Sequence, residues 1–188
     1  INTILQAVQA RYLIGVLNPK QTEVIPVRNF RADIAVSREY KGNRGDKPDW
    51  YKKWAPVIEE RLITKWGFKR VAPHLEADDV VLICRNMLEN SFIVSNDKDL
   101  LNLEGRHYCP RTDEWVETSK EQAEYFFWTS MITGDAADNI KGLPGKGKVF
   151  AEKLLLPLKS GYMEAVFREY LYQFAEEEGV EEFYKNYK

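Results

Sequence analysis

"EADDVVLICRNMLENSFIVSNDKDL", residues 76–100, places a helix-like stretch directly before a strand-like one. The acids at its start suit the positive N-terminal end of a helix, and apolar residues at helical spacing follow them. The segment at residues 91–97 is short, apolar and bounded by acids, which is typical of a buried strand. A helix followed at once by such a strand indicates an α/β protein.

The sequence on either side continues this alternation of helices and strands. Predicted helices cover residues 1–17, 56–68, 119–134 and 146–158, with further helix to the end, and predicted strands cover residues 22–27, 69–73, 106–110 and 114–118. Ser119 is the expected N-cap of its helix. Residues 28–50 are polar, basic and aromatic, and we expect a long loop there. The fold class predicted is therefore α/β, with a mostly parallel central sheet flanked by helices.

Composition restricts the possible classes of protein. The chain has 188 residues, of which 44% are hydrophobic and 30% charged, so it can form a packed core as one domain with or without a small appendage. No apolar run is long enough to span a membrane, and no signal peptide is visible. Cys84 and Cys109 lack CxxC spacing, which favours free thiols in a reducing compartment and a cytoplasmic protein. The net charge is −2, but the charges are unevenly distributed, with a basic region at residues 38–53 and an acidic one at 176–182.

Acidic residues form clusters near the predicted junctions between elements. They are Glu76, Asp78 and Asp79, then Asp97 and Asp99, then Asp135 and Asp138. Crowded carboxylates repel one another unless cations neutralise them. Oxygen ligands without an accompanying histidine suit Mg²⁺ or Mn²⁺ rather than zinc. The sequence therefore predicts a divalent-metal site, although an isolated "EADD" is also typical of a helix cap.

"TGDAADNIKGLPGKGK", residues 133–148, sets the last acids directly before a turn rich in glycine and lysine. The turn contains Gly142, Gly145 and Gly147, together with Lys146 and Lys148. Glycines permit close backbone approach, and the N–H groups of a following helix favour an anion. The turn follows a helix and lacks the GxxxxGK[ST] pattern, so it is not a P-loop. A helix–hairpin–helix that holds one DNA backbone strand is our interpretation, with an ordinary tight turn as the alternative.

A basic and aromatic segment at about residues 28–53 is predicted to form an arch. It contains Phe30, Arg31, Arg38, Tyr40, Lys41 and Arg44. Aromatic rings stack on unpaired bases while lysine and arginine hold phosphates. The segment thus favours contact with single-stranded DNA, and the alternative is a solvated surface loop.

With these motifs and "YKGNR" in hand, the sequence resembles the 5′-to-3′ exonuclease and flap endonuclease family, of bacteriophage type and similar to the nuclease domain of bacterial DNA polymerase I. The resemblance covers nearly the whole chain, to about residue 160. It implies a PIN-like 5′ nuclease core over residues 1–130, which includes the arch. It also implies a helix–hairpin–helix DNA-binding region and C-terminal helices over residues 131–188, packed on the core.

The resemblance also implies roles for individual residues. Glu76, Asp78 and Asp79 would bind one divalent ion, while Asp97, Asp99, Asp135 and Asp138 would serve a second ion or both. Lys41 and Arg44 match the basic pair of the family's arch and Arg31 matches the arginine of its "FR", so these three are the candidate catalytic cations. Tyr40 is a candidate for stacking on a base. Residues 142–148 would contact the duplex backbone and hold a K⁺ ion.

Two carboxylates of the family are absent from their expected places. Family members open with a strand that carries a metal-binding aspartate, and this sequence is expected to start after that strand. A second aspartate ends the strand before the "FR" arginine. The corresponding stretch here is expected to be "EVIPVRN", residues 23–29, which has no acid after Glu23.

The leading hypothesis is a structure-specific nuclease that hydrolyses DNA phosphodiesters at or near 5′ ends, by a mechanism with two Mg²⁺ or Mn²⁺ ions. Its partners would be DNA with 5′ ends, flaps or nicks and replication proteins, and the chain would act as a monomer in the cytoplasm, that of the bacterial host if phage-encoded. One competing hypothesis is a non-catalytic or weakly active relative that binds branched DNA without a full metal site. Another is a metal-dependent ribonuclease of the PIN-like fold.

Overall fold

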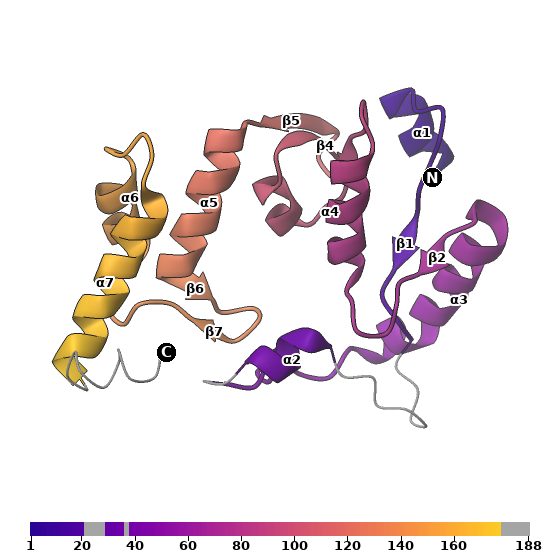
Figure 1. Cartoon of the computed structure of the whole chain (residues 1–188). Helices are drawn as coiled ribbons and strands as arrows, with labels where there is room; N and C mark the ends of the chain where they lie inside the picture. The colour runs from indigo at the N-terminus through magenta and orange to yellow at the C-terminus, as the bar shows by residue number, and fades with distance from the viewer. Residues whose placement is uncertain (21–28, 36–37, 178–188) are drawn as a thin grey trace. The chain divides into compact units, whose positions relative to one another are not determined.

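The computed structural model describes residues 1–20, 29–35 and 38–177. The chain divides into two compact units (Figure 1). Unit 1 comprises Ile1–Tyr40 and Arg44–Thr118, and unit 2 comprises Lys41–Asn43 and Ser119–Lys188. The division into domains expected from the sequence, after residue 130, stays a prediction.

Unit 1 holds helices and short strands in alternation. It contains α1 (Asn2–Val8), β1 (Val16–Leu17), α2 (Phe30–Ile34), α3 (Asp49–Trp66), β2 (Lys69–Arg70), α4 (Ala77–Met87), β3 (Ile93–Val94), the 3₁₀ helix η1 (Lys98–Asn102), β4 (Gly105–Cys109) and β5 (Glu114–Thr118). β1 pairs with β2 and β3 pairs with β4, both in parallel, whereas β4 and β5 form an antiparallel hairpin. The α/β prediction is therefore confirmed. In the described part of unit 1 the strands lie in two sheets, β1–β2 and β3–β4–β5.

The expected helix over residues 1–17 is wrong in its second half. α1 ends at Val8, because Gln9 takes a left-handed conformation (φ 51°) and its N–H turns back to the last carbonyls of the helix. Residues 16 and 17 form β1 instead. Gly15 permits this path: a Cβ there would lie 2.3 Å from Cδ2 of Phe68. The strand predicted at residues 22–27 lies outside the described residues.

The expected loop over residues 28–50 contains helix at both ends. α2 starts after Asn29, whose side chain accepts a hydrogen bond from the Arg31 N–H at 3.0 Å and so caps the helix. α3 begins at Asp49 rather than at residue 56, because Pro48 and an acid in the first turn start the helix earlier than the apolar spacing alone indicates. Residues 38–48, between these helices, carry no regular element beyond a turn at residues 40–43.

Unit 2 contains α5 (Lys120–Thr133), β6 (Gly134–Asp135), β7 (Ile140–Lys141), α6 (Lys148–Leu155) and α7 (Tyr162–Glu177). Ser119 caps α5 as predicted, accepting from the N–H of Gln122 at 3.2 Å in a capping box. The helices pack around a core of Ile132, Leu143, Ala151, Leu155 and Val166. The Tyr170 hydroxyl donates to the Met131 carbonyl at 2.6 Å and so joins α7 to α5.

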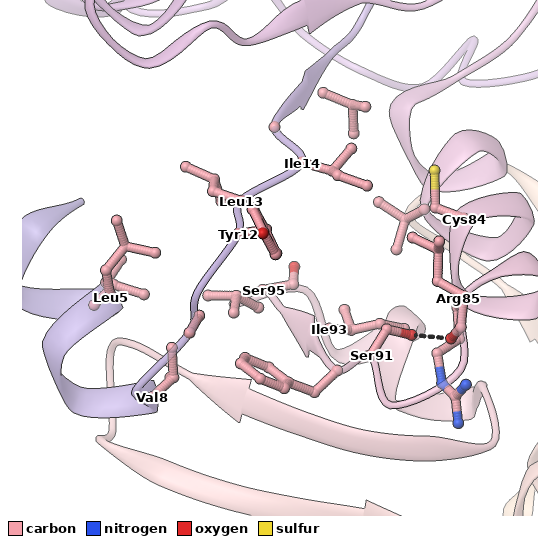
Figure 2. A pocket seen from close by; sticks show the side chains of 18 of the residues that line it. Leu5, Val8, Tyr12, Leu13, Ile14, Cys84, Arg85, Ser91, Ile93 and Ser95 are labelled. Atoms are coloured by element: carbon pink, nitrogen blue, oxygen red, sulfur yellow. Dashed lines mark hydrogen bonds between the residues drawn. The ribbon is translucent and has the colours of Figure 1, made fainter.

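An apolar cavity of about 930 Å³ lies in unit 1 between α1, β1, α4 and β3. Figure 2 shows Leu5, Leu13 and Ile14 on one side of it and Cys84 and Ile93 on the other. α4 is amphipathic, yet none of its side chains is fully buried. The face of α4 that lines this cavity, from Ala77 to Arg85, is therefore loosely packed. Among the described residues, none of the helices has both the length and the apolarity that a membrane span requires.

His107 is buried in the β3–β4–β5 sheet at 2% exposure, and its Nε2 lies 2.8 Å from the Leu103 carbonyl. Burial lowers the pKa of this histidine below its ordinary value of 6.5. Below pH 6.5 this histidine is therefore protonated more in the unfolded chain than in the folded one, so its contribution to stability is full above pH 6.5 and is lost as the pH drops below it.

We expect the melting temperature to fall by a few degrees between pH 7 and pH 5. His107→Gln, which keeps a side-chain N–H for the Leu103 carbonyl but does not titrate, should flatten this dependence. Thermal melts at stepped pH test it, and an unchanged slope in the variant would contradict the assignment.

Candidate functional site

The N-terminus of α4 is built by a reciprocal cap. Glu76 is the N-cap residue, and its side chain accepts from the Asp79 N–H, while the Asp79 carboxylate accepts from the Glu76 N–H at 2.8 Å. The helix-cap alternative left open for "EADD" is therefore what the structure shows. A cap does not exclude a metal role, because each carboxylate has lone pairs beyond the cap bond.

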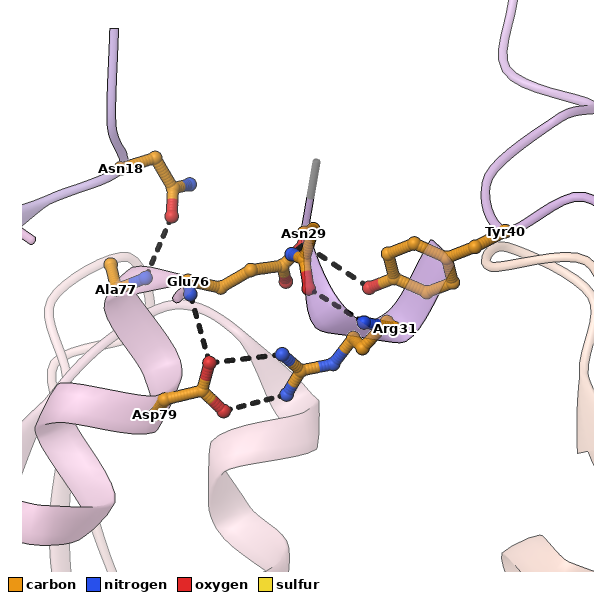
Figure 3. A network of polar contacts seen from close by, with 7 residues as sticks. All are labelled: Asn18, Asn29, Arg31, Tyr40, Glu76, Ala77 and Asp79. Carbon is orange, nitrogen blue, oxygen red and sulfur yellow. Dashed lines mark hydrogen bonds and ion pairs between the residues drawn. The ribbon is translucent and has the colours of Figure 1, made fainter. Parts of the chain in front are cut away.

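Arg31 binds the same carboxylate from α2. Its Nη1 and Nη2 donate to Oδ2 and Oδ1 of Asp79 at 2.9 and 2.7 Å, in the two-pronged geometry shown in Figure 3. The side chains are 28% and 18% exposed, so the pair is partly shielded from water. The hydrogen bond to Asp79, and the charges of Asp79 and Glu76, raise the pKa of Arg31 against the opposing effect of burial.

Glu76 is held from two further directions. Its Oε1 accepts from Nδ2 of Asn29 at 2.9 Å and from the Tyr40 hydroxyl at 3.2 Å. Asn29, Arg31 and Tyr40 all belong to the basic and aromatic segment at residues 28–53. Their contacts attach this segment to the start of α4 (Figure 3). Tyr40, predicted as a stacking residue, is here a hydrogen-bond donor. Its role toward DNA stays a prediction.

Asn18 is a site residue that the sequence reasoning missed. It directly follows β1, and its Oδ1 accepts from the Ala77 N–H at 2.7 Å, at the start of α4. The expectation that residues 23–29 form the strand before the "FR" arginine stays a prediction, because residues 21–28 lie outside the described part of the chain. The signal was the apolar run of residues 12–17 that ends in Asn18. The side chain at the end of the described strand is thus an amide rather than a carboxylate.

Asp97 and Asp99 follow β3, as expected for acids at a strand's carboxyl end. An extended chain would have pointed both the same way, but η1 begins at Lys98. Asp97 is its N-cap, with Oδ1 accepting from the Asp99 N–H at 3.0 Å. The relative position of these two residues is therefore determined by a helix cap rather than by the alternation of side chains along a strand.

Asp135 and Asp138 lie in unit 2 on the β6–β7 hairpin. Oδ1 of Asp135 accepts from the N–H groups of Ala137 and Asp138 at 2.8 and 3.4 Å, so a tight turn, not a helix, brings the two residues together. The Lys41 N–H donates to the Asp138 carbonyl at 3.0 Å. The backbone of the candidate catalytic residue Lys41 is thus fixed to the backbone of the candidate acid Asp138 within this unit.

The glycine-lysine turn closes the hairpin onto α6. Gly142 packs so tightly that a Cβ there would lie 2.1 Å from the Ile132 carbonyl oxygen. Gly145 takes a positive φ of 70°, and Gly147 is the N-cap residue of α6. The chain runs from α5 through the β6–β7 hairpin and this turn into α6, and the interpretation of this path as a helix–hairpin–helix stays a prediction.

The cations of the turn are differently placed. Lys146 Nζ lies 4.2 Å from the centre of the Phe150 ring. Lys148 is 80% exposed and pairs only loosely with Glu152, at 3.8 Å. Both side chains stand at the start of α6, where backbone N–H groups favour an anion.

Comparison with known proteins identifies relatives of this chain. No protein-family model matches it. It is 32% identical over 126 residues to the 5′-3′ exonuclease of Buchnera aphidicola subsp. Acyrthosiphon pisum, covering 58% of this chain and 43% of that protein. It is 26% identical over 191 residues to DNA polymerase I of Streptococcus pneumoniae, covering 89% of this chain. The chain is a relative of the 5′ nucleases.

Solved structures agree with this relationship. A bacteriophage T5 flap endonuclease in a complex with DNA and metal ions has a TM-score of 0.61 at 18% identity, over 99% of this chain and 86% of that one. A T5 5′-exonuclease with bound zinc has a TM-score of 0.57 at 20% identity, over 92% and 77%. The 5′ nuclease fold expected from the sequence is therefore confirmed. The chain spans about a fifth of the length of the polymerase relatives that it matches, 20% for the pneumococcal one.

The candidate carboxylates of this 5′ nuclease relative fit a hard divalent cation by their chemistry, since all are oxygen ligands. Their arrangement fits less well. In residues 1–20, 29–35 and 38–177, no group of three or more Asp, Glu, His or Cys side chains lies close enough to hold a metal ion. In unit 1 the carboxylate of Asp79 instead faces a guanidinium. The metal roles assigned from the sequence thus stay predictions.

Proposed function

We propose that this chain is a structure-specific deoxyribonuclease that hydrolyses phosphodiesters at or near 5′ ends, as a 5′-3′ exonuclease or flap endonuclease. The observation that carries the proposal is its 32% identity to a protein named as a 5′-3′ exonuclease. Two groups of carboxylates are consistent with this chemistry. Asp97 and Asp99 follow β3, and Asp135 and Asp138 lie on β6 and in the turn after it, shortly before the lysine-bearing turn in the sequence. DNA with 5′ ends, flaps or nicks would be the substrate.

The acids of the three clusters would hold two Mg²⁺ or Mn²⁺ ions. Such ions, when bound, supply Lewis acidity toward the phosphate and lower the pKa of bound water. Around them, the chain's own cations would offset charge that builds up on the scissile phosphate. Lys41 is suited to this because its backbone is fixed at the Asp138 carbonyl, and Arg31 and Arg44 would assist it. A K⁺ ion at residues 142–148 is part of the same proposal.

The turn at residues 142–148 would bind the backbone of duplex DNA. Its N–H groups at the start of α6, with Lys146 and Lys148, offer a site for one phosphate without reading bases. Contacts of this kind determine where the duplex lies, while the acids determine where it is cut.

Lys148→Gln should weaken binding of nicked duplex DNA, because a lysine that no longer neutralises a phosphate reduces the slope of log K against log salt by about 1. Fluorescence anisotropy at several salt concentrations measures this slope. Lys159→Gln, an exposed lysine of the same unit outside the turn, is the matched control and should leave the slope unchanged. Equal slopes for both variants would remove the turn from the binding surface.

The proposed activity is tested with 5′-labelled flap and nicked DNA in Mg²⁺, with EDTA as the control. Products with a 5′-phosphate and a 3′-hydroxyl are expected. RNA strands of the same sequence test the ribonuclease alternative, since preferential cleavage of RNA would favour it over the proposal.

A second candidate function is a relative that binds branched DNA with little or no turnover. The observation that favours it is that β1 is followed by an amide, Asn18, while the stretch expected to carry the family's second aspartate has no acid after Glu23. Tight binding of flap DNA without products in Mg²⁺ or Mn²⁺ would support this candidate.

A further inference from the structure

The turn that carries Lys41 is attached to the β6–β7 hairpin by two hydrogen bonds. The Lys41 N–H donates to the Asp138 carbonyl at 3.0 Å. Nδ2 of Asn43 donates to the Ala136 carbonyl at 2.6 Å. Lys41–Asn43 and the hairpin belong to unit 2, so both bonds lie within one unit. The first bond uses only the backbone, whereas the second depends on the side-chain amide of the asparagine.

The hairpin holds the two acceptor carbonyls in a fixed geometry. Oδ1 of Asp135 accepts from the N–H groups of Ala137 and Asp138, which closes the turn between the strands. The Ala136 carbonyl also accepts from the Asn139 N–H at 3.4 Å. A carbonyl oxygen has two lone pairs, so it can accept this bond and the bond from the asparagine amide together. The attachment point is therefore formed by the hairpin itself.

Lys41 needs such an attachment because of its backbone conformation. Its φ of 58° lies in the left-handed region, which is uncommon for residues other than glycine and persists where surrounding contacts hold it. The bonds from its own N–H and from Asn43, two residues later, are contacts of this kind. Because the stem of a lysine is flexible, the position of the backbone limits where the ammonium group can reach.

We propose that Asn43 is a positioning residue, whose side-chain amide holds Lys41 at the hairpin that carries Asp138. The inference rests on the proposed function for its consequence, since Lys41 is there the cation that offsets charge on the scissile phosphate. In this role Asn43 acts through Lys41 and makes no contact with the reacting atoms. It raises the fraction of molecules in which the cation is in place.

Amide hydrogen exchange of the full chain, measured by NMR without DNA, tests the contact directly. Asn43→Ala should speed exchange of the Lys41 N–H about fivefold, the factor that corresponds to about 1 kcal/mol for one hydrogen bond. Asn43→Asp has nearly the same shape, but a carboxylate cannot donate to a carbonyl, so it should lose at least as much protection. Unchanged exchange in either variant would overturn the proposal.

Asn86→Ala is the matched control for these measurements. Asn86 is an exposed asparagine on α4 in unit 1, away from the turn in the sequence. Its substitution should leave exchange of the Lys41 N–H unchanged. Equal acceleration in Asn86→Ala and Asn43→Ala would mean that the effect is not specific to the turn, and would overturn the proposal.

Cleavage of 5′-flap DNA separates positioning from contact with DNA. Asn43→Ala should lower kcat about fivefold with little change in KM, because the lost hydrogen bond is internal to the protein. A higher KM with unchanged kcat would indicate that Asn43 contacts DNA, and would overturn the proposal. Faster exchange with unchanged kcat and KM would overturn it as well.

The two measurements distinguish failure of this inference from failure of the proposed function. If exchange responds as expected but the unaltered chain cuts no DNA, the proposed function fails while the contact inferred for Asn43 stands. If the unaltered chain cuts flap DNA and Asn43→Ala changes neither exchange nor kcat, the inference fails while the proposed function stands.

Discussion

Asp135→Asn is expected to reduce cleavage of 5′-flap DNA by about 100-fold or more, because under the proposed function it removes a metal ligand and with it several kcal/mol of transition-state stabilisation. The substitution preserves the local structure. Oδ1 of Asp135 accepts from the Ala137 N–H at 2.8 Å, and an asparagine keeps that oxygen while it loses the charge. Cleavage is measured under single turnover in Mg²⁺, and binding of the same flap by anisotropy should be unchanged.

Asp97→Asn should behave in the same way, since an asparagine also serves as the N-cap of η1. Asp46→Asn is the control, because Asp46 is an exposed acid whose 3.5 Å pair with Lys52 lies outside the acidic clusters. Full activity in Asp135→Asn or Asp97→Asn would remove that residue from the metal site. Equal losses in Asp46→Asn would mean that the effect arises from net charge.

The sequence predicted the parts of the fold that local chemistry specifies. The Ser119 cap, the hairpin of β4 and β5, and the helix-to-strand step from α4 to β3 all carry their signals within a few residues. The division of residues 1–17 was not predictable in this way. Apolar positions there suit one helix, and the break after Val8 depends on a left-handed Gln9 and on packing of Gly15 against the distant Phe68.

The sequence supplied the candidate site residues, whose roles stay predictions, but not the contacts between them. The acids were found from their clusters, and the turn from its glycines and lysines. The pairing of Arg31 with Asp79 joins residues 48 apart, and no spacing rule in the sequence indicates it. Asn18 was missed because its role depends on a contact with Ala77 of α4, 59 residues away, which no spacing rule in the sequence indicates.

Gly142→Ala is expected to give the largest loss of stability in unit 2, about 3 kcal/mol, at the upper end for overpacking. Its Cβ would lie 2.1 Å from the Ile132 carbonyl oxygen, 2.4 Å from the Thr133 carbonyl carbon and 2.5 Å from the Gly134 nitrogen. All three atoms belong to the backbone, so no side-chain rotation relieves the contact. Urea unfolding measures the loss.

Gly147→Ala separates this packing role from flexibility of the turn. A Cβ at Gly147 meets nothing within 4 Å, and its φ of −99° suits alanine, so the cost should stay near the roughly 1 kcal/mol typical of a weaker N-cap. Comparable losses in the two variants would contradict the packing argument. The Leu143 N–H donates to the Ile132 carbonyl at 2.8 Å, so a Cβ at Gly142 would disturb the bond that joins the turn to α5. Because Ile132 and Leu143 are also core residues, the backbone proposed to bind DNA is fixed by the same contact that closes the core.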